Sequence, residues 1–489
     1  MKTPDPNIAF RSASDLAAMI RARLLSAEDL LELYLARVQR YNPEINAIVK
    51  LDEEGARKSA READEALRGG TIIGPLHGVA ITVKESFDVV GMPTTWGLQQ
   101  MRENFPARTA ATVERLRQAG AVIFGKTNVP VRLADWQTFN PIYGVTRNPW
   151  DLTLTPGGSS GGSAAALAAG LTALELGSDI GASIRGPAHF CGVYGHKPTY
   201  GVVPYEGHAL PGGPSGLDII VAGPLARSPD DLMLAMDILA APEEQDAPAW
   251  SLRLPRAGKQ KIQDYRIAVM ADHPTAEVDS VISGALEQLG HKLAREGAHV
   301  DFAARPAFDP AEAHEVYLLL LRAATSAALN DEGFENCRQV AERSDPADKS
   351  YFAIQARGNS MPHRQWIKLD QRRREMCLAW RAFFDEYDLM LCPTGATTAF
   401  PHNHQGERWE RMVIVNGKPQ PSTTQMFWAG YSGMAYLPST VAPIGLSERG
   451  LPIGVQIIGP LYGDLACIAF AQLMQQHFGG FVPPPSFVE

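Results

Sequence analysis

Eight consecutive residues, 156–163, read Pro-Gly-Gly-Ser-Ser-Gly-Gly-Ser and constrain the fold more than any other part of the chain. Glycine lacks a Cβ atom and tolerates positive φ, so such a run lets the backbone approach a ligand closely. A flexible linker has a similar composition. However, an alanine-rich, helix-like stretch follows at residues 164–170, and strand-like sequence follows at 174–179. We therefore expect an ordered loop and not a linker.

Strand-like and helix-like segments alternate around this loop. A β-branched run at residues 79–83 ends at Lys84, a helix is expected at 112–120, and a short strand at 121–124. This alternation favours an α/β fold with a parallel sheet covered by helices. Further strands are expected at residues 265–270, 389–392, 439–442 and 453–458, and further helices at 53–67, 276–295 and 310–385.

Two helices are predicted near the N-terminus. Ser12 and Ser26 each open a Ser-x-x-Asp pattern ahead of an apolar run, which is typical of a helix start. Asn42 and Pro43 are expected to end the second helix, because this pair marks turns.

Composition excludes several classes of protein. The 489 residues include 45 Lys and Arg against 54 Asp and Glu, a net charge of −9, which argues against a nucleic-acid partner. No apolar run of membrane-spanning length and no signal-peptide core occurs, so we expect a cytoplasmic protein without membrane contact. The five cysteines form no Cys-x-x-Cys pair, which argues against structural zinc and a disulfide framework.

Three kinds of chemistry are compatible with a Gly/Ser-rich loop. Phosphate binding would need a Gly-Lys-Ser/Thr ending, but Gly162 is followed by Ser163 and Ala164. Residues 157–161 match the Gly-x-Ser-x-Gly pattern of the α/β-hydrolase nucleophile elbow. That elbow follows a strand, whereas a loop is expected before Gly157. The third is a Ser-Lys site, in which burial lowers the pKa of Lys84 from about 10.4 toward neutrality and frees the amine to act as a base. A structural lysine paired with a carboxylate is the alternative for Lys84.

The motifs around these residues resemble the amidase signature family. They lie at residues 74–85, 125–128, 146–151, 156–166, 177–185, 190–201 and 451–459. The resemblance is dense from 74 to 235, recurs from 387 to 475 and is thin between. It implies an α/β fold: a single large domain over residues 1–489, with a central mixed, mainly parallel sheet covered by helices on both faces.

The resemblance also implies how this domain is divided along the chain. Its expected parts are N-terminal helices (1–70), a signature core (74–235), a variable connection and helical insertion (about 241–385) and the C-terminal part of the core (387–489).

A Ser–cis-Ser–Lys triad is implied by the same resemblance. Ser183 would be the nucleophile, Ser159 the bridging serine and Lys84 the base, at the family's separations of 75 and 24 residues. The Gly158–Ser159 peptide bond would be cis.

An oxyanion hole is implied at the turn before the nucleophile. Its donors would be the backbone N–H groups of Ile180, Gly181, Ala182 and Ser183. Ser160, Asp179 and Arg185 would support the loop and the turn. Ala182 stands where the family usually has glycine, so it must avoid a positive φ or accept the strain.

Variable segments are expected to line the substrate pocket. The first, residues 133–143, carries Trp136, Phe139 and Tyr143. The second, near 310–366, carries the aromatic residues Tyr317, Tyr351 and Trp366. Aromatic lining is common in ligand pockets.

The expected function is hydrolysis of linear carbon–nitrogen bonds through a serine acyl-enzyme. We expect small aryl or alkyl amides as substrates, with esters or carbamates as side substrates, no cofactor and no metal. The sequence does not decide whether the protein forms a homodimer. The alternative is the glutaminase subunit of a tRNA-dependent amidotransferase, which residues 212–220 fit poorly. A non-catalytic binding protein would need a lost triad residue, and all three are present.

Overall fold

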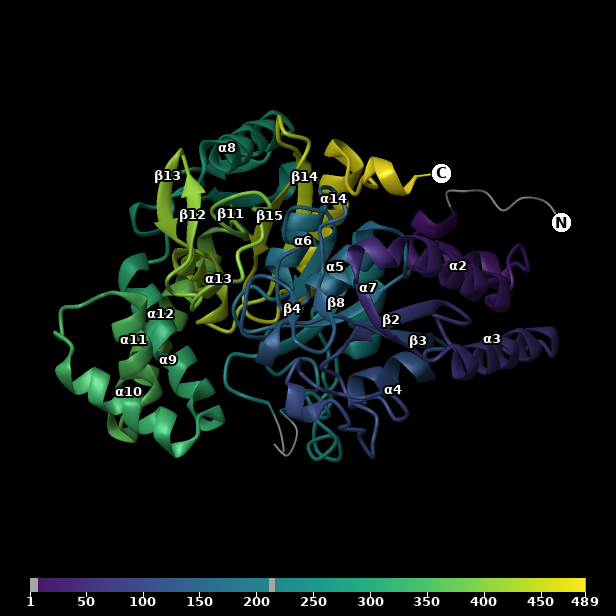
Figure 1. Ribbon diagram of the computed structural model, residues 1–489. Coiled ribbons are helices and arrows are strands. Elements are labelled where there is room, and N and C mark those ends of the chain that lie inside the picture. The colour runs from purple at the N-terminus through teal and green to yellow at the C-terminus, as the bar shows by residue number, and fades with distance from the viewer. Residues whose placement is uncertain (1–7, 211–215, 489) are drawn as a thin grey trace.

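A central eleven-stranded sheet organises the fold in the computed structural model, which describes residues 8–210 and 216–488 (Figure 1). Its strands are β1 (Ile48–Leu51), β2 (Ala80–Lys84), β3 (Val122–Thr127), β6 (Glu175–Asp179), β7 (Tyr194–Lys197), β8 (Val221–Ala226), β9 (Arg266–Val269), β10 (His299–Asp301), β11 (Leu389–Pro393), β14 (Ser439–Leu446) and β15 (Pro452–Ile458). Their order is β1-β3-β2-β6-β8-β7-β14-β15-β11-β9-β10. Two smaller sheets pair β4 (Phe139–Asn140) with β5 (Gly144–Val145) and β12 (Met412–Val415) with β13 (Lys418–Pro421).

The expected α/β fold with a mixed central sheet is confirmed, but parallel pairing is less extensive than expected. Among the described residues, parallel pairs join β3, β2 and β6, and also β11, β9 and β10. The other neighbours in the large sheet are antiparallel. Strand β8 inserts between β6 and β7, and a short connection joins β14 to β15, which favours antiparallel pairing.

Helices cover both faces of this sheet. They are α1 (Ala13–Arg21), α2 (Ala27–Ile45), α3 (Glu53–Arg68), α4 (Ala111–Gln118), α5 (Gly161–Ala168), α6 (Arg185–Cys191), α7 (Pro229–Leu239), α8 (Ser280–Arg295), α9 (Pro310–Thr325), α10 (Asp331–Arg343), α11 (Tyr351–Asn359), α12 (His363–Glu386), α13 (Met426–Gly433) and α14 (Asp464–Phe478). Helices α5 and α6 pack together on one face, and α7 and α14 pack together on the other. Helices α9 to α12 gather at one side of the molecule, where the sequence predicts a helical insertion (Figure 1).

The N-terminal helices begin as predicted, but the second ends later. Ser12 and Ser26 accept hydrogen bonds from the backbone of Asp15 and Asp29, so both are N-caps. Helix α2 continues past Pro43 to Ile45. Pro43 lies in the last turn, so the one hydrogen bond that it cannot donate is lost only at the end of the helix.

The Gly/Ser-rich segment is an ordered, buried part of the fold. Helix α5 begins inside it, at Gly161, and every residue of α5 is buried. An ideal Cβ on Gly162 would lie 2.4 Å from the backbone nitrogen of Asn128 and 2.7 Å from its oxygen. The glycine therefore allows α5 to pack directly against the backbone that follows β3.

Gly162→Ala should destabilise the protein by about 1–3 kcal/mol, because the added methyl group meets backbone that cannot move aside. Gly284→Ala is the control: Gly284 lies inside α8 with nothing within 4 Å of an added Cβ, so the exchange should stabilise the helix by up to about 1 kcal/mol. Urea unfolding measures both variants. Equal effects would contradict the close packing of α5.

Candidate active site

Lys84 ends the buried strand β2, and its amine lies inside a polar pocket. The side chain is fully buried, and Nζ lies 2.6 Å from Ser159 Oγ and 2.9 Å from Ser178 Oγ. Burial lowers the pKa of Lys84 to about 7, although Asp179 and Glu175 oppose the shift. A large fraction of the amine is therefore neutral near pH 7, and it touches a serine hydroxyl.

Ser178 was not singled out by the sequence prediction. It lies in β6, whose five residues are all buried. A buried hydroxyl in a strand needs a partner, and this is the signal that could have indicated its contact with Lys84. On the same strand, Glu175 accepts a hydrogen bond from Thr82, and burial raises the pKa of Glu175 to about 8.

The structure brings the three serines of the predicted site together. The Gly158–Ser159 peptide bond is cis, as the family resemblance implies. Ser160 N donates to the carbonyl of Ser183 at 3.0 Å, which ties the Gly/Ser-rich loop to the turn before α6. Ser183 is only 5% exposed and lines a cavity. Among the described residues, no hydrogen bond joins the hydroxyls of Ser159 and Ser183.

The turn from Ile180 to Ser183 borders the same cavity, which Ile180, Gly181 and Ser183 line. Within the described parts of the chain, the N–H groups of Ile180, Gly181 and Ser183 have no hydrogen-bond partner. The N–H of Ala182 instead donates to Asp179 at 3.0 Å, so the expectation of a fourth donor there is wrong. Ala182 accepts the strained conformation, with φ at 69°.

Two aromatic side chains hold the carbonyl groups of this turn. The Tyr317 hydroxyl donates to the carbonyl of Ile180, and the Trp136 indole donates to that of Gly181, each at 2.8 Å. In a trans peptide the carbonyl and the following N–H point in opposite directions. Tyr317 therefore turns the N–H of Gly181 away from α9. In the same way, Trp136 turns the N–H of Ala182 away from the Trp136 indole.

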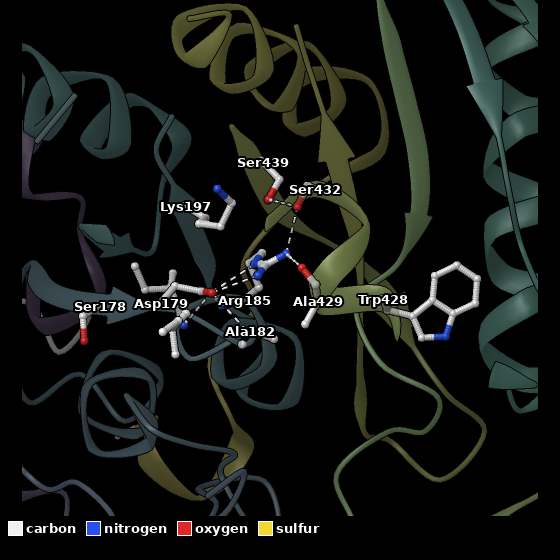
Figure 2. Close-up of polar contacts among 12 residues, drawn as sticks. Ser178, Asp179, Ala182, Arg185, Lys197, Trp428, Ala429, Ser432 and Ser439 are labelled. Carbon is white, nitrogen blue, oxygen red and sulfur yellow. Dashed lines mark hydrogen bonds and ion pairs between the residues drawn. The ribbon is translucent and has the colours of Figure 1, made fainter. Parts of the chain in front are cut away.

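A buried ion pair supports the turn from behind (Figure 2). Asp179 and Arg185 pair at 2.8 Å and are almost completely buried, and Asp179 also accepts from the backbone N–H of Ile184. Burial alone would raise the pKa of Asp179, but the Arg185 guanidinium outweighs it and lowers the pKa to about 2. Arg185 also donates to Ser432 Oγ and to Gln456 Oε1, which ties the turn to α13 and β15.

A cavity of about 1350 Å³ lies over the turn. Trp136 lines it as expected, but Phe139 and Tyr143 do not, within the described chain. Phe139 stacks on His404 with ring centroids 3.9 Å apart, and the Tyr143 phenol faces Glu85. Phe139 and Tyr143 therefore pack against these neighbours and not into the cavity.

Helices α9 and α11 supply part of the cavity wall. Tyr351 lines the cavity, whereas Trp366 does not, as far as the described residues show. Tyr317 reaches the turn through its hydroxyl instead. His196, which is buried between Thr440 and Asp464, is away from this site.

Residues 8–210 and 216–488 contain no group of three or more His, Cys, Asp and Glu side chains that could hold a metal ion. No helix within these ranges is both long and apolar enough to cross a membrane.

Comparison with known proteins identifies the family. The amidase family model matches residues 29–468. The chain is 31% identical to an indoleacetamide hydrolase of Bradyrhizobium diazoefficiens (94% of this chain, 86% of the relative) and 32% identical to an acylamidase of Rhodococcus erythropolis (93% and 92%). It is also 33% identical to a glutamyl-tRNA(Gln) amidotransferase subunit of Acidothermus cellulolyticus (93% and 92%).

A solved structure agrees with these sequence matches. The crystal structure of an amidase superposes with a TM-score of 0.78 at 28% identity, covering 96% of this chain and 100% of the other. The fold and the site thus define a hydrolase that acts on amides. This chain belongs to the amidase signature family.

Asp179→Ala should lower the free energy of unfolding by about 3–5 kcal/mol, because it leaves the buried Arg185 charge without its partner. Glu32→Ala is the matched control: it removes an exposed partner of Arg57 and should change stability very little. Urea unfolding compares the two variants. A small effect of Asp179→Ala would show that the pair does not hold the turn.

Proposed function

We propose that this protein hydrolyses small amides through an acyl-enzyme on Ser183, with Lys84 as the base and Ser159 as the relay between them. The observation that carries the proposal is the buried Lys84 amine, 2.6 Å from Ser159 Oγ. The next residue, Ser160, is hydrogen bonded to Ser183, which lines a large cavity. A neutral amine accepts a proton, and a buried site keeps water from competing for it.

The first half of the reaction transfers the acyl group. Neutral Lys84 accepts the Ser159 proton as Ser159 accepts the Ser183 proton, and Ser183 Oγ bonds to the amide carbon. Because these two serines do not hydrogen bond in the structure, this step needs one hydroxyl to rotate. The proton then returns through Ser159 to the leaving nitrogen, the carbon–nitrogen bond breaks and the amine departs.

The second half regenerates the enzyme. Water gives a proton to the same relay and bonds to the acyl carbon. The carbon–oxygen bond to Ser183 then breaks, and the relay returns the proton to Ser183 Oγ. In both halves the carbonyl oxygen becomes negative. We propose that the unpartnered N–H groups of Ile180, Gly181 and Ser183 stabilise it, since each donor of this kind contributes roughly 10²–10³ to the rate.

The proposed substrates are small aryl or alkyl amides. Trp136, Leu321 and Met426 give the cavity an apolar and aromatic wall, which suits such groups. The names of the indoleacetamide hydrolase and acylamidase relatives agree with this class. Esters and carbamates would follow the same acyl-transfer route.

A glutaminase subunit is the second candidate, because the amidotransferase relative is as similar as the others. Residues 212–220 bear on this choice at the sequence level. Of these, 212–215 lie outside the described residues. The substrate preference of the purified protein separates the two candidates.

A fluorophosphonate probe should label Ser183, because it would be the activated hydroxyl beside free N–H donors. Peptide mapping by mass spectrometry locates the label, and chelators should not affect the reaction. Ser163→Ala, which removes another buried serine of the loop, should retain labelling. A label on any serine other than Ser183 would overturn the assignment.

The rate should rise with pH. Below pH 7 Lys84 is protonated and cannot act as a base, so kcat/KM should rise about tenfold per pH unit there and level off above about pH 8. Lys84→Met should lose at least about 10³-fold in activity, as expected when the base of a catalytic triad is removed. His196→Ala should lose far less.

Lys126→Met is the matched control for a buried lysine. Thr127 lies opposite Lys84 in the sheet register, so Lys126, its neighbour in β3, points to the other face. Its amine donates to the carbonyl of Pro93 at 2.7 Å. A folded Lys126→Met protein should keep the wild-type pH profile. If Lys126→Met lost the rise of kcat/KM with pH while Lys84→Met stayed active, the proposal would be contradicted.

Small anilides and aryl esters should be hydrolysed faster than free glutamine, because an aryl leaving group departs more easily than ammonia. Steady-state kinetics on a panel of anilides, primary amides, esters and carbamates, with Ser183→Ala as the blank, tests this. Free glutamine as the best substrate, or a need for partner chains and tRNA, would favour the glutaminase candidate.

A further inference from the structure

Arg322 is a buried cation without an anionic partner at the wall of the cavity. It lies near the end of α9, is 9% exposed and lines the cavity. Its Nε has no hydrogen-bond partner, and within the described residues the charged or polar groups that act on its guanidinium are Tyr351, Arg408 and Tyr317, with no carboxylate among them. A buried guanidinium stays charged, and an unpaired buried charge is costly.

The packing of two helices holds Arg322 in this place. An ideal Cβ on Gly358 of α11 would lie 2.5 Å from the Cβ of Arg322 and 3.0 Å from the carbonyl of Leu319. The glycine thus lets α11 pack directly on α9 and bury the stem of Arg322. The guanidinium is therefore positioned by the fold and is not a mobile surface group.

A second cation lies close to it. The guanidinium carbons of Arg322 and Arg408 lie 5.7 Å and 5.8 Å from the centre of the Tyr351 ring. Arg408 also lines the cavity and donates to the carbonyl of Ala134 and to Gln355 Oε1, both uncharged. Two positive charges that act on each other therefore lie near one aromatic ring at this wall, and neither has a carboxylate partner among the described residues.

We propose that Arg322 and Arg408 form a binding site for a carboxylate carried by the amide substrate, at a distance from the scissile bond. Guanidinium groups bind carboxylates through paired, charge-assisted hydrogen bonds. The inference rests on the proposed amidase function and specifies its substrate class: amides with a free carboxylate on the acyl or the amine side.

The position along α9 indicates the spacing. Tyr317 of the same helix contacts the turn that carries the proposed oxyanion donors. Arg322 follows five residues later, which is about 7.5 Å along the helix axis. The carboxylate would therefore be separated from the scissile carbonyl by several bonds.

Matched substrate pairs test the site. The acyl-side pairs are the mono-4-nitroanilides of succinic, glutaric and adipic acid against the butanoyl, pentanoyl and hexanoyl 4-nitroanilides. The amine-side pair is N-acetyl-4-aminobenzoate against its methyl ester. For wild type we expect kcat/KM to favour the carboxylate member about tenfold or more in at least one series, because a hydrogen bond to a charged group contributes that much.

Variants assign the preference to the two arginines. Arg322→Gln should reduce the ratio of kcat/KM between paired members to near one, and Arg322→Lys should retain part of it. Arg449→Gln is the control, since Arg449 lines the same cavity but is exposed, and it should keep the wild-type ratio. If Arg322→Gln does not fold, Arg408→Gln, whose side chain is only half-buried, must lower the ratio.

The outcomes separate this inference from the proposed function. Hydrolysis of both members without a carboxylate preference in either series, or an unchanged ratio in Arg322→Gln, would overturn the carboxylate site and leave the amidase function intact. No hydrolysis of any member would contradict both.

Discussion

The buried ion pair between Asp179 and Arg185 is the interaction on which the rest of the site depends. Asp179 accepts hydrogen bonds from the backbone N–H groups of Ala182 and Ile184, so it fixes the turn that carries Ser183. Arg185 extends the pair to α13 and β15. A buried pair of this kind adds little net stability compared with apolar packing, but it is costly to break. Its contribution is therefore the geometry of the turn, which leaves three N–H groups without partners beside the cavity, within the described chain.

The same buried surroundings account for the chemistry of Lys84. A lysine at the end of an interior strand loses hydration, and the nearby carboxylates restore only part of the cost. The amine is consequently a base near neutral pH and not a permanent cation. Arg322 responds differently to burial, because a guanidinium does not lose its proton in proteins. We therefore propose that the buried Lys84 amine serves proton transfer, while the Arg322 guanidinium is suited to hold a negative group of the substrate.

The sequence predicted the parts of the site that lie in short, local motifs. Lys84, Ser159 and Ser183 could be located because each lies in a distinctive stretch of the signature, and their roles stay proposals. The sequence did not predict contacts made across the fold. Tyr317 and Arg322 reach the site only through the packing of α9, and Phe139 is turned away by its stacking on His404. The extent of parallel pairing was not predicted correctly for the same reason. Strand β8 lies between β6 and β7, and this placement depends on tertiary packing and not on a local sequence pattern.

The proposed mechanism requires that much of the Lys84 amine is neutral near pH 7. Nuclear magnetic resonance of ¹⁵N-labelled lysine side chains, with Lys84→Met used to assign the signal, measures this titration directly. We expect a midpoint for Lys84 near pH 7, far below the ordinary lysine value of about 10.4. A midpoint close to the ordinary value would contradict it, because the amine would then be protonated throughout the range in which we expect it to act as a base.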